Sequence, residues 1–145
     1  MKEPLLISAC LLGENCKYSG GNNYCPAVEQ LKERYELHPV CPERDGGLPI
    51  PRPPAERQGE RVINTEGMDV TVQYVLGAEI ALQTARQRGC TKALLKERSP
   101  SCGHGLIYDG TFSHTLTSRS GVAAQLLAEH GIALFGESQI SDLMK

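Results

Sequence analysis

The chain has 145 residues, 40% of them hydrophobic and 22% charged, which is typical of one globular domain over residues 1–145. Its net charge of −2 argues against a protein that grips a large nucleic acid through the phosphate backbone, because such proteins are usually basic. No apolar run approaches the ~20 residues of a membrane span, and the first residues do not resemble a signal peptide. We therefore expect a cytoplasmic protein with no membrane partner.

Short apolar runs alternate with helical patterns along the chain. The predicted elements are a strand at 4–10, a helix from Pro26 with Val28, Leu31 and Tyr35 on one face, a strand at 37–41, a helix at 69–88, strands at 92–97 and 106–108, a helix at 120–130, a strand at 132–135 and a short helix at 138–144. Asp69 and Gly89 have the residue types of a helix start and a helix stop. Residues 42–64 are polar and proline-rich without periodicity, which predicts a long loop that covers a site.

This alternation predicts βαβ units, a mostly parallel sheet and right-handed crossovers. The expected fold is therefore α/β, a three-layer Rossmann-like domain with helices on both faces of the sheet. Neither a G-x-G-x-x-G fingerprint nor a Walker-type phosphate loop occurs, so no dinucleotide is expected.

Three of the six cysteines, Cys10, Cys41 and Cys102, lie where a predicted strand gives way to a loop. Ligands of open parallel sheets bind outside the carboxyl ends of the strands, so three thiols can converge there. No C-x-x-C pair occurs, which argues against a zinc ribbon and a ferredoxin-type run. A metal or iron–sulfur site assembled by the fold is therefore the first hypothesis, and three ligands would leave one coordination position open. The residues leave open whether Cys16 replaces one of the three.

Two side chains next to these cysteines are candidates for proton transfer. Glu43 follows Cys41 in Cys-Pro-Glu, and Ser101 directly precedes Cys102. A carboxylate at the mouth of a metal site can act as a general acid or base. The alternatives are a solvated loop carboxylate for Glu43 and a turn-forming role for Ser101.

A phosphate site is predicted at two places. Arg52 lies in the proline-rich segment, and Ser118, Arg119 and Ser120 precede a predicted helix. Free backbone N–H groups at a helix start, with hydroxyls and an arginine, suit a phosphate. The alternative is ordinary capping of the helix by a serine.

Several blocks resemble a bacterial family of thiouracil and thiouridine desulfidases, once catalogued as a domain of unknown function. They occur in the family's order at residues 8–13 and 16–20, 39–43 and 46–52, and 99–103 and 107–110. Two departures are Ser19, where the family commonly has an acidic residue, and 118–121, where it has a glycine-rich stretch.

The resemblance implies a [4Fe–4S] cluster held by Cys10, Cys41 and Cys102, with one iron not ligated by the protein. It implies non-redox removal of sulfur, as hydrogen sulfide, from a thiolated pyrimidine such as thiouracil or thiouridine monophosphate. Sulfur is a soft ligand that prefers such an iron to hard oxygen donors. Glu43 and Ser101 would move the protons. A non-catalytic iron–sulfur or zinc-binding accessory module is the alternative from another class.

Overall fold

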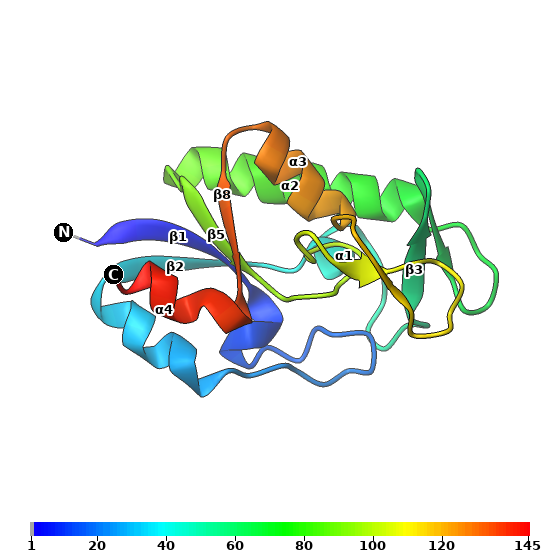
Figure 1. The fold of residues 1–145 in the computed structure, drawn as a ribbon, viewed down its shortest axis with the longest axis horizontal. Coiled ribbons are helices and arrows are strands. Elements are labelled where there is room, and N and C mark those ends of the chain that lie inside the picture. The colour runs from blue at the N-terminus through cyan, green and yellow to red at the C-terminus, as the bar shows by residue number, and fades with distance from the viewer. Residues whose placement is uncertain (1) are drawn as a thin grey trace.

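The structure is a computed structural model that describes residues 2–145. Within them, a sheet of four parallel strands forms the middle layer in the order β2-β1-β5-β8 (Figure 1). The strands are β1 (Glu3–Ser8), β2 (Tyr35–Val40), β5 (Lys92–Leu95) and β8 (Ala133–Gly136). The predicted three-layer α/β fold with a parallel sheet is confirmed.

The period-2 alternation of the central strands separates two hydrophobic layers. Leu6, Ala93 and Leu95 point to the face covered by α2 (Thr71–Arg88) and α3 (Val122–Glu129). Leu5 and Leu94 point to the other face, which packs against the 3₁₀ helix η2 (Pro26–Glu33) and α4 (Ile140–Leu143). Both strands that supply these residues are buried on both faces, as central parallel strands usually are. In the described part of the chain, no helix is both long and apolar enough to cross a membrane.

Short helical turns complete the elements around the sheet. They are η1 (Ala9–Leu12), directly after β1, and η3 (Glu137–Gln139), directly after β8. The predicted stop of α2 at Gly89 is confirmed by its left-handed φ of 71°. Asp69 lies one residue before the N-cap position of α2, and its Oδ1 accepts a 2.9 Å hydrogen bond from the backbone N–H of Thr71.

The structure corrects the prediction of a loop over residues 42–64. This segment contains α1 (Pro42–Asp45) and a hairpin of β3 (Ala55–Gln58) and β4 (Arg61–Asn64). Both strands have only four residues, which is too short for their alternation to stand out among charged neighbours. A second short hairpin pairs β6 (Ile107–Tyr108) with β7 (Leu116–Thr117), of which only β6 was predicted.

The helix predicted from Pro26 is a 3₁₀ helix, and Tyr35 does not lie on its apolar face. Tyr35 instead begins β2, pairs with Glu3 and donates a 2.6 Å hydrogen bond to the carbonyl of Leu143. The spacing was compatible with a helix because Val28, Leu31 and Tyr35 all pack into the same hydrophobic cluster. Tertiary packing therefore fixes where the helix ends.

Two glycines let α1 lie directly against α2. A methyl group on Gly77 would overlap the carbonyl oxygen of Pro42, and one on Gly46 would overlap that of Gln73. This close approach fixes the backbone that carries Glu43, the residue after Pro42.

We expect Gly77→Ala to lower the free energy of unfolding by about 1–3 kcal/mol, because α1 must move away from α2. Urea denaturation measures the effect. Gln83→Ala, at an exposed position of the same helix, is the control and should stay within about 0.5 kcal/mol of the parent chain. Equal stability of the two variants would show that α1 does not depend on this contact.

Candidate functional site

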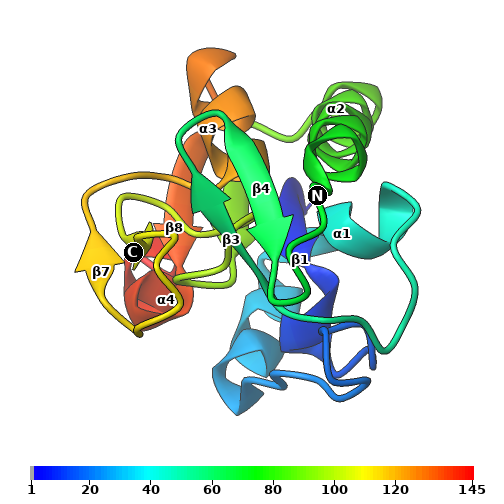
Figure 2. The ribbon, with the colours of Figure 1, turned by 90° about the vertical axis from the view of Figure 1, so that its right-hand side faces the viewer.

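A cleft of about 550 Å³ opens beyond the carboxyl ends of β1, β2 and β5. Figure 2 views the molecule with the β3–β4 hairpin and β7 toward the reader. The cleft is lined by Cys10 after β1, Cys41 after β2 and Cys102 in the loop after β5. The structure thus brings the three predicted cysteines to one cleft at the predicted edge of the sheet.

Burial shifts the pKa values of two of these thiols. It raises the pKa of Cys102 to about 12, against smaller lowering by hydrogen bonds from Ser8 and Ser101. It also raises the pKa of Cys10, which the neighbouring Cys41 raises further. Thiols with raised pKa values stay neutral unless a strong Lewis acid takes the place of the proton.

Cys16 is a fourth thiol in the same cleft. Its side chain is buried, and its carbonyl accepts hydrogen bonds from Arg52 at 2.9 Å and from the Cys41 thiol at 3.7 Å. A hydrogen bond from Cys16 lowers the pKa of Cys41 to about 7, and the same contact raises that of Cys16. Of this pair, Cys41 is therefore the more acidic thiol.

The remaining two cysteines do not line this cleft. Cys90 belongs to the hydrophobic cluster between α2 and the sheet. Cys25 packs at the edge of the opposite cluster and lines a separate shallow depression.

The spacing of the cysteines bears on what they can hold. Within residues 2–145, no three His, Cys, Asp or Glu side chains are gathered closely enough to bind one metal ion. Thiolates on one zinc lie about 4 Å apart, because each Zn–S bond is about 2.3 Å long. An iron–sulfur cluster has several iron atoms and takes its thiolates one on each iron. The three cleft cysteines are soft donors of the kind that hold iron–sulfur clusters.

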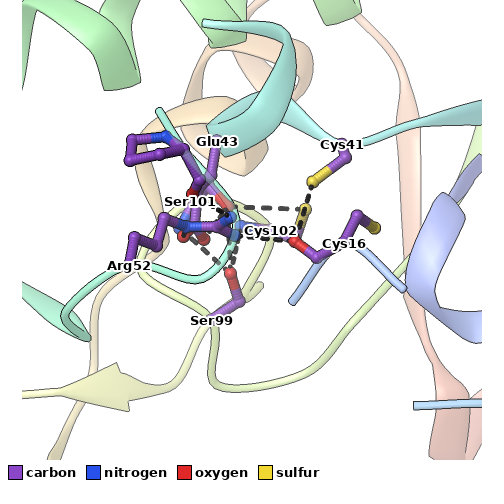
Figure 3. Close-up of polar contacts among 8 residues, drawn as sticks. Cys16, Cys41, Glu43, Arg52, Ser99, Ser101 and Cys102 are labelled. Atoms are coloured by element: carbon purple, nitrogen blue, oxygen red, sulfur yellow. Dashed lines mark hydrogen bonds and ion pairs between the residues drawn. The ribbon is translucent and has the colours of Figure 1, made fainter. Parts of the chain in front are cut away.

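Beside the cysteines, Glu43 lies between a hydroxyl group and a guanidinium group (Figure 3). Ser101 donates a hydrogen bond of 2.9 Å to Glu43 Oε2, and Arg52 Nε donates one of 3.1 Å to Oε1. The Ser101 hydroxyl is also 3.7 Å from the Cys102 sulfur. Both predicted proton-transfer residues are thus in contact with each other and next to a cysteine.

The start of α1 positions Glu43. Pro42 occupies the first turn of α1, and the carboxylate of Asp45 accepts a 3.0 Å hydrogen bond from the backbone N–H of Cys41. Tyr74 of α2 lies behind Glu43, where burial and then this carboxylate raise the pKa of the tyrosine. The sequence did not single out Tyr74, because a buried aromatic on a helix is usually a core residue.

Ser99 holds the loop that carries Ser101 and Cys102. Its Oγ accepts hydrogen bonds from the backbone N–H groups of both residues, at 3.1 and 3.0 Å. The start of α3 supports the loop from behind, because Ala124 N–H donates to the Ser101 carbonyl and a side chain on Gly121 would overlap that residue's backbone.

These contacts bear on the predicted phosphate site. Three backbone N–H groups at the start of α3, those of Gly121, Val122 and Ala124, donate to carbonyl groups of the loop that carries Cys102. Ser118, Arg119 and Ser120 do not line the cleft; Arg119 pairs with Glu60 at 2.8 Å, and the Ser120 hydroxyl accepts from Gly105. The phosphate prediction for these residues finds no support in their contacts.

Arg52, the other predicted phosphate ligand, does line the cleft but is already engaged. Its guanidinium donates to Glu43, to the Cys16 carbonyl and, at 3.2 Å, to the Pro49 carbonyl. Its side chain is only 4% exposed, and that of Glu43 15%. Arg52 therefore links the proline-rich segment and the Cys16 loop to the catalytic candidate Glu43 by hydrogen bonds.

We expect Arg52→Ala to lower the free energy of unfolding by about 2–4 kcal/mol, because it leaves a largely buried carboxylate without its partner. Urea denaturation measures the loss, and Arg61→Ala at an exposed position is the control. In a Glu43→Gln background the loss should be clearly smaller, since no charge is then left unpaired. An Arg52→Ala chain as stable as the Arg61→Ala chain would contradict this role.

Known proteins resemble this chain over almost its whole length. The profile of the family described as 2-thiouracil desulfurase matches residues 5–139. The uncharacterized protein YbbK of Bacillus subtilis (strain 168) is 37% identical over 150 residues, which span 97% of this chain and 99% of YbbK. The solved structure of the [4Fe–4S]-dependent thiouracil desulfidase TudS is similar with a TM-score of 0.92 and 44% identity, over 99% of this chain and 96% of TudS. From the matched length and this identity, we conclude that the chain belongs to the 2-thiouracil desulfurase family.

Proposed function

We propose that the protein is a desulfidase that hydrolyses a thiolated pyrimidine to the corresponding oxo-pyrimidine and hydrogen sulfide. The observation that carries this proposal is the contact between Ser101 and Glu43 beside the cleft cysteines. It joins a proton-transfer pair to a set of soft donors, which is what cleavage of a carbon–sulfur bond with water requires. Membership of the desulfurase family supports it.

The donor set supports a [4Fe–4S] cluster as the cofactor, as in the similar desulfidase TudS. Cys10, Cys41 and Cys102 would hold it, because each comes from a different strand end and all three line the cleft. When bound, the cluster would supply an iron without a protein ligand, a soft Lewis acid for the thiocarbonyl sulfur.

The chain's own residues supply the proton transfers. The overall reaction adds one water, and two protons that start on this water end on the sulfur. Glu43 accepts a proton from the attacking water, and the hydroxyl of Ser101 passes a proton between Glu43 Oε2 and the substrate. Arg52 holds Oε1, so that Oε2 faces the serine.

Anaerobic turnover of 2-thiouracil tests the proposal. The protein reconstituted with iron and sulfide should convert 2-thiouracil to uracil with one sulfide released per uracil, followed by the loss of thiocarbonyl absorbance. Thiouridine monophosphate, run in parallel, distinguishes a base from a nucleotide as the substrate. A protein that binds iron and sulfide but turns over neither compound would instead be the accessory module.

A further inference from the structure

The turn between β6 and β7, residues 109–115, forms part of the wall of the cysteine cleft. Phe112 and His114 of this turn line the cleft, together with Tyr108 of β6. Phe112 is a large hydrophobic side chain that stays 37% exposed, and the His114 ring stands edge-on to Tyr108 with ring centroids 5.7 Å apart. These aromatic rings have no part in the proposed proton transfers or in holding the cluster.

The backbone of this wall is in a conformation that side chains rarely adopt. Among residues 2–145, positive φ values occur at three residues other than glycine, namely Arg98 at 68°, Phe112 at 57° and His114 at 59°. All three line the same cleft. For a bulky residue such as phenylalanine this conformation is unfavourable, and proteins keep such residues mainly at functional sites.

The neighbouring hairpin holds the turn in place. Glu56 Oε1, on β3, accepts hydrogen bonds from the backbone N–H groups of Gly110 at 3.0 Å and Phe112 at 3.2 Å. Gln58 donates a 2.8 Å hydrogen bond to the carbonyl of Gly110, and a side chain on Gly110 would overlap the Arg57 carbonyl oxygen. Phe112 is therefore presented on a fixed support.

We propose that Phe112 is a specificity-determining residue whose ring stacks on the pyrimidine of the substrate. This inference rests on the proposed function and adds the group that recognises the ring, whereas the cysteine side of the cleft recognises the sulfur. A cleft of about 550 Å³ has the size of a site for a small molecule. Nucleobases stack readily on aromatic side chains, and each such contact contributes substantially to binding.

Binding of uracil to the protein without its cluster tests the inference apart from catalysis. Saturation transfer from the protein to the H5 and H6 protons of uracil reports the stacked ring, and a titration gives the dissociation constant. Phe112→Leu should weaken uracil binding roughly five- to tenfold, the lower part of the range for stacking, because the ring is partly exposed. Phe112→Tyr should bind like the parent chain. Tyr24→Leu, at an exposed aromatic outside this cleft, is the matched control and should bind uracil unchanged.

A second variant separates recognition from structure. Phe112→Gly removes the penalty of the left-handed backbone, so its melting temperature should equal or exceed that of the parent chain while uracil binding falls. In the reconstituted enzyme, Phe112→Leu should raise KM by a similar factor with kcat largely retained.

The outcomes distinguish this inference from the proposed function. An active parent enzyme whose Phe112→Leu variant keeps its KM and its uracil affinity would overturn the stacking role alone. A Phe112→Gly chain that melts at a lower temperature and keeps its uracil affinity would likewise overturn it, since the ring would then be structural. A reconstituted parent chain that binds uracil through Phe112 but releases no sulfide would overturn the proposed function instead.

Discussion

Alanine in place of Cys102 is expected to remove both the iron of the reconstituted protein and its desulfidase activity. Cys102 lines the cleft with Cys10 and Cys41, and a cluster that keeps only two thiolates is poorly held. The chain should still fold, since removing one sulfur atom from a buried site costs about 1–2 kcal/mol. Iron per chain after anaerobic reconstitution and the rate of 2-thiouracil turnover are the two measurements.

The matched control for this experiment is Cys90→Ala. Cys90 is also buried, at 4% exposure like Cys102, and both belong to the hydrophobic cluster between α2 and the sheet, but Cys90 does not line the cleft. The control should therefore keep its iron and its activity while losing similar stability. A Cys102→Ala protein that retains iron and turns over thiouracil would show that Cys102 is not a ligand. In that event Cys16, the fourth thiol of the cleft, would be the next to replace.

Glutamine in place of Glu43 is expected to leave the iron content unchanged and to lower kcat by about 10²–10⁴-fold. Glutamine has nearly the same shape and still offers an oxygen to Arg52 or Ser101, but it cannot accept a proton from water. General acid–base groups contribute factors of this size. Single-turnover rates with 2-thiouracil, at equal iron per chain, measure the effect.

Glu79→Gln makes the same chemical change at an exposed position of α2 and should leave kcat unaltered. Full activity of the Glu43→Gln enzyme would exclude acid–base chemistry at this carboxylate. Loss of iron in this variant would instead give Glu43 a role in cluster binding.

The position of the site could be predicted from the sequence because it follows from local patterns. Apolar runs that end at Cys10 and Cys41 predict strand ends, and the carboxyl ends of parallel strands meet at one edge of a sheet. In the structure Cys41 directly follows β2, and Cys10 lies two residues after the end of β1, in η1. Adjacency in sequence was also enough to bring Glu43 near Cys41 and Ser101 near Cys102.

Other features depend on contacts between distant segments, which local patterns do not encode. Tyr74 lies behind Glu43 only because glycines allow α1 to pack closely on α2. Phe112 lines the cleft from a turn whose backbone donates a hydrogen bond to Glu56 of another hairpin. At Ser118 and Ser120, hydroxyls near a helix start suggested a phosphate, but the N–H groups of that helix donate to the cysteine loop instead.

The most direct test of this account is the iron and acid-labile sulfide content of the protein after anaerobic reconstitution, measured together with the conversion of 2-thiouracil. We expect about four iron and four sulfide per chain, with uracil and sulfide formed in equal amounts. Stable binding of one zinc per chain in place of this cluster, with no release of sulfide from 2-thiouracil, would contradict it.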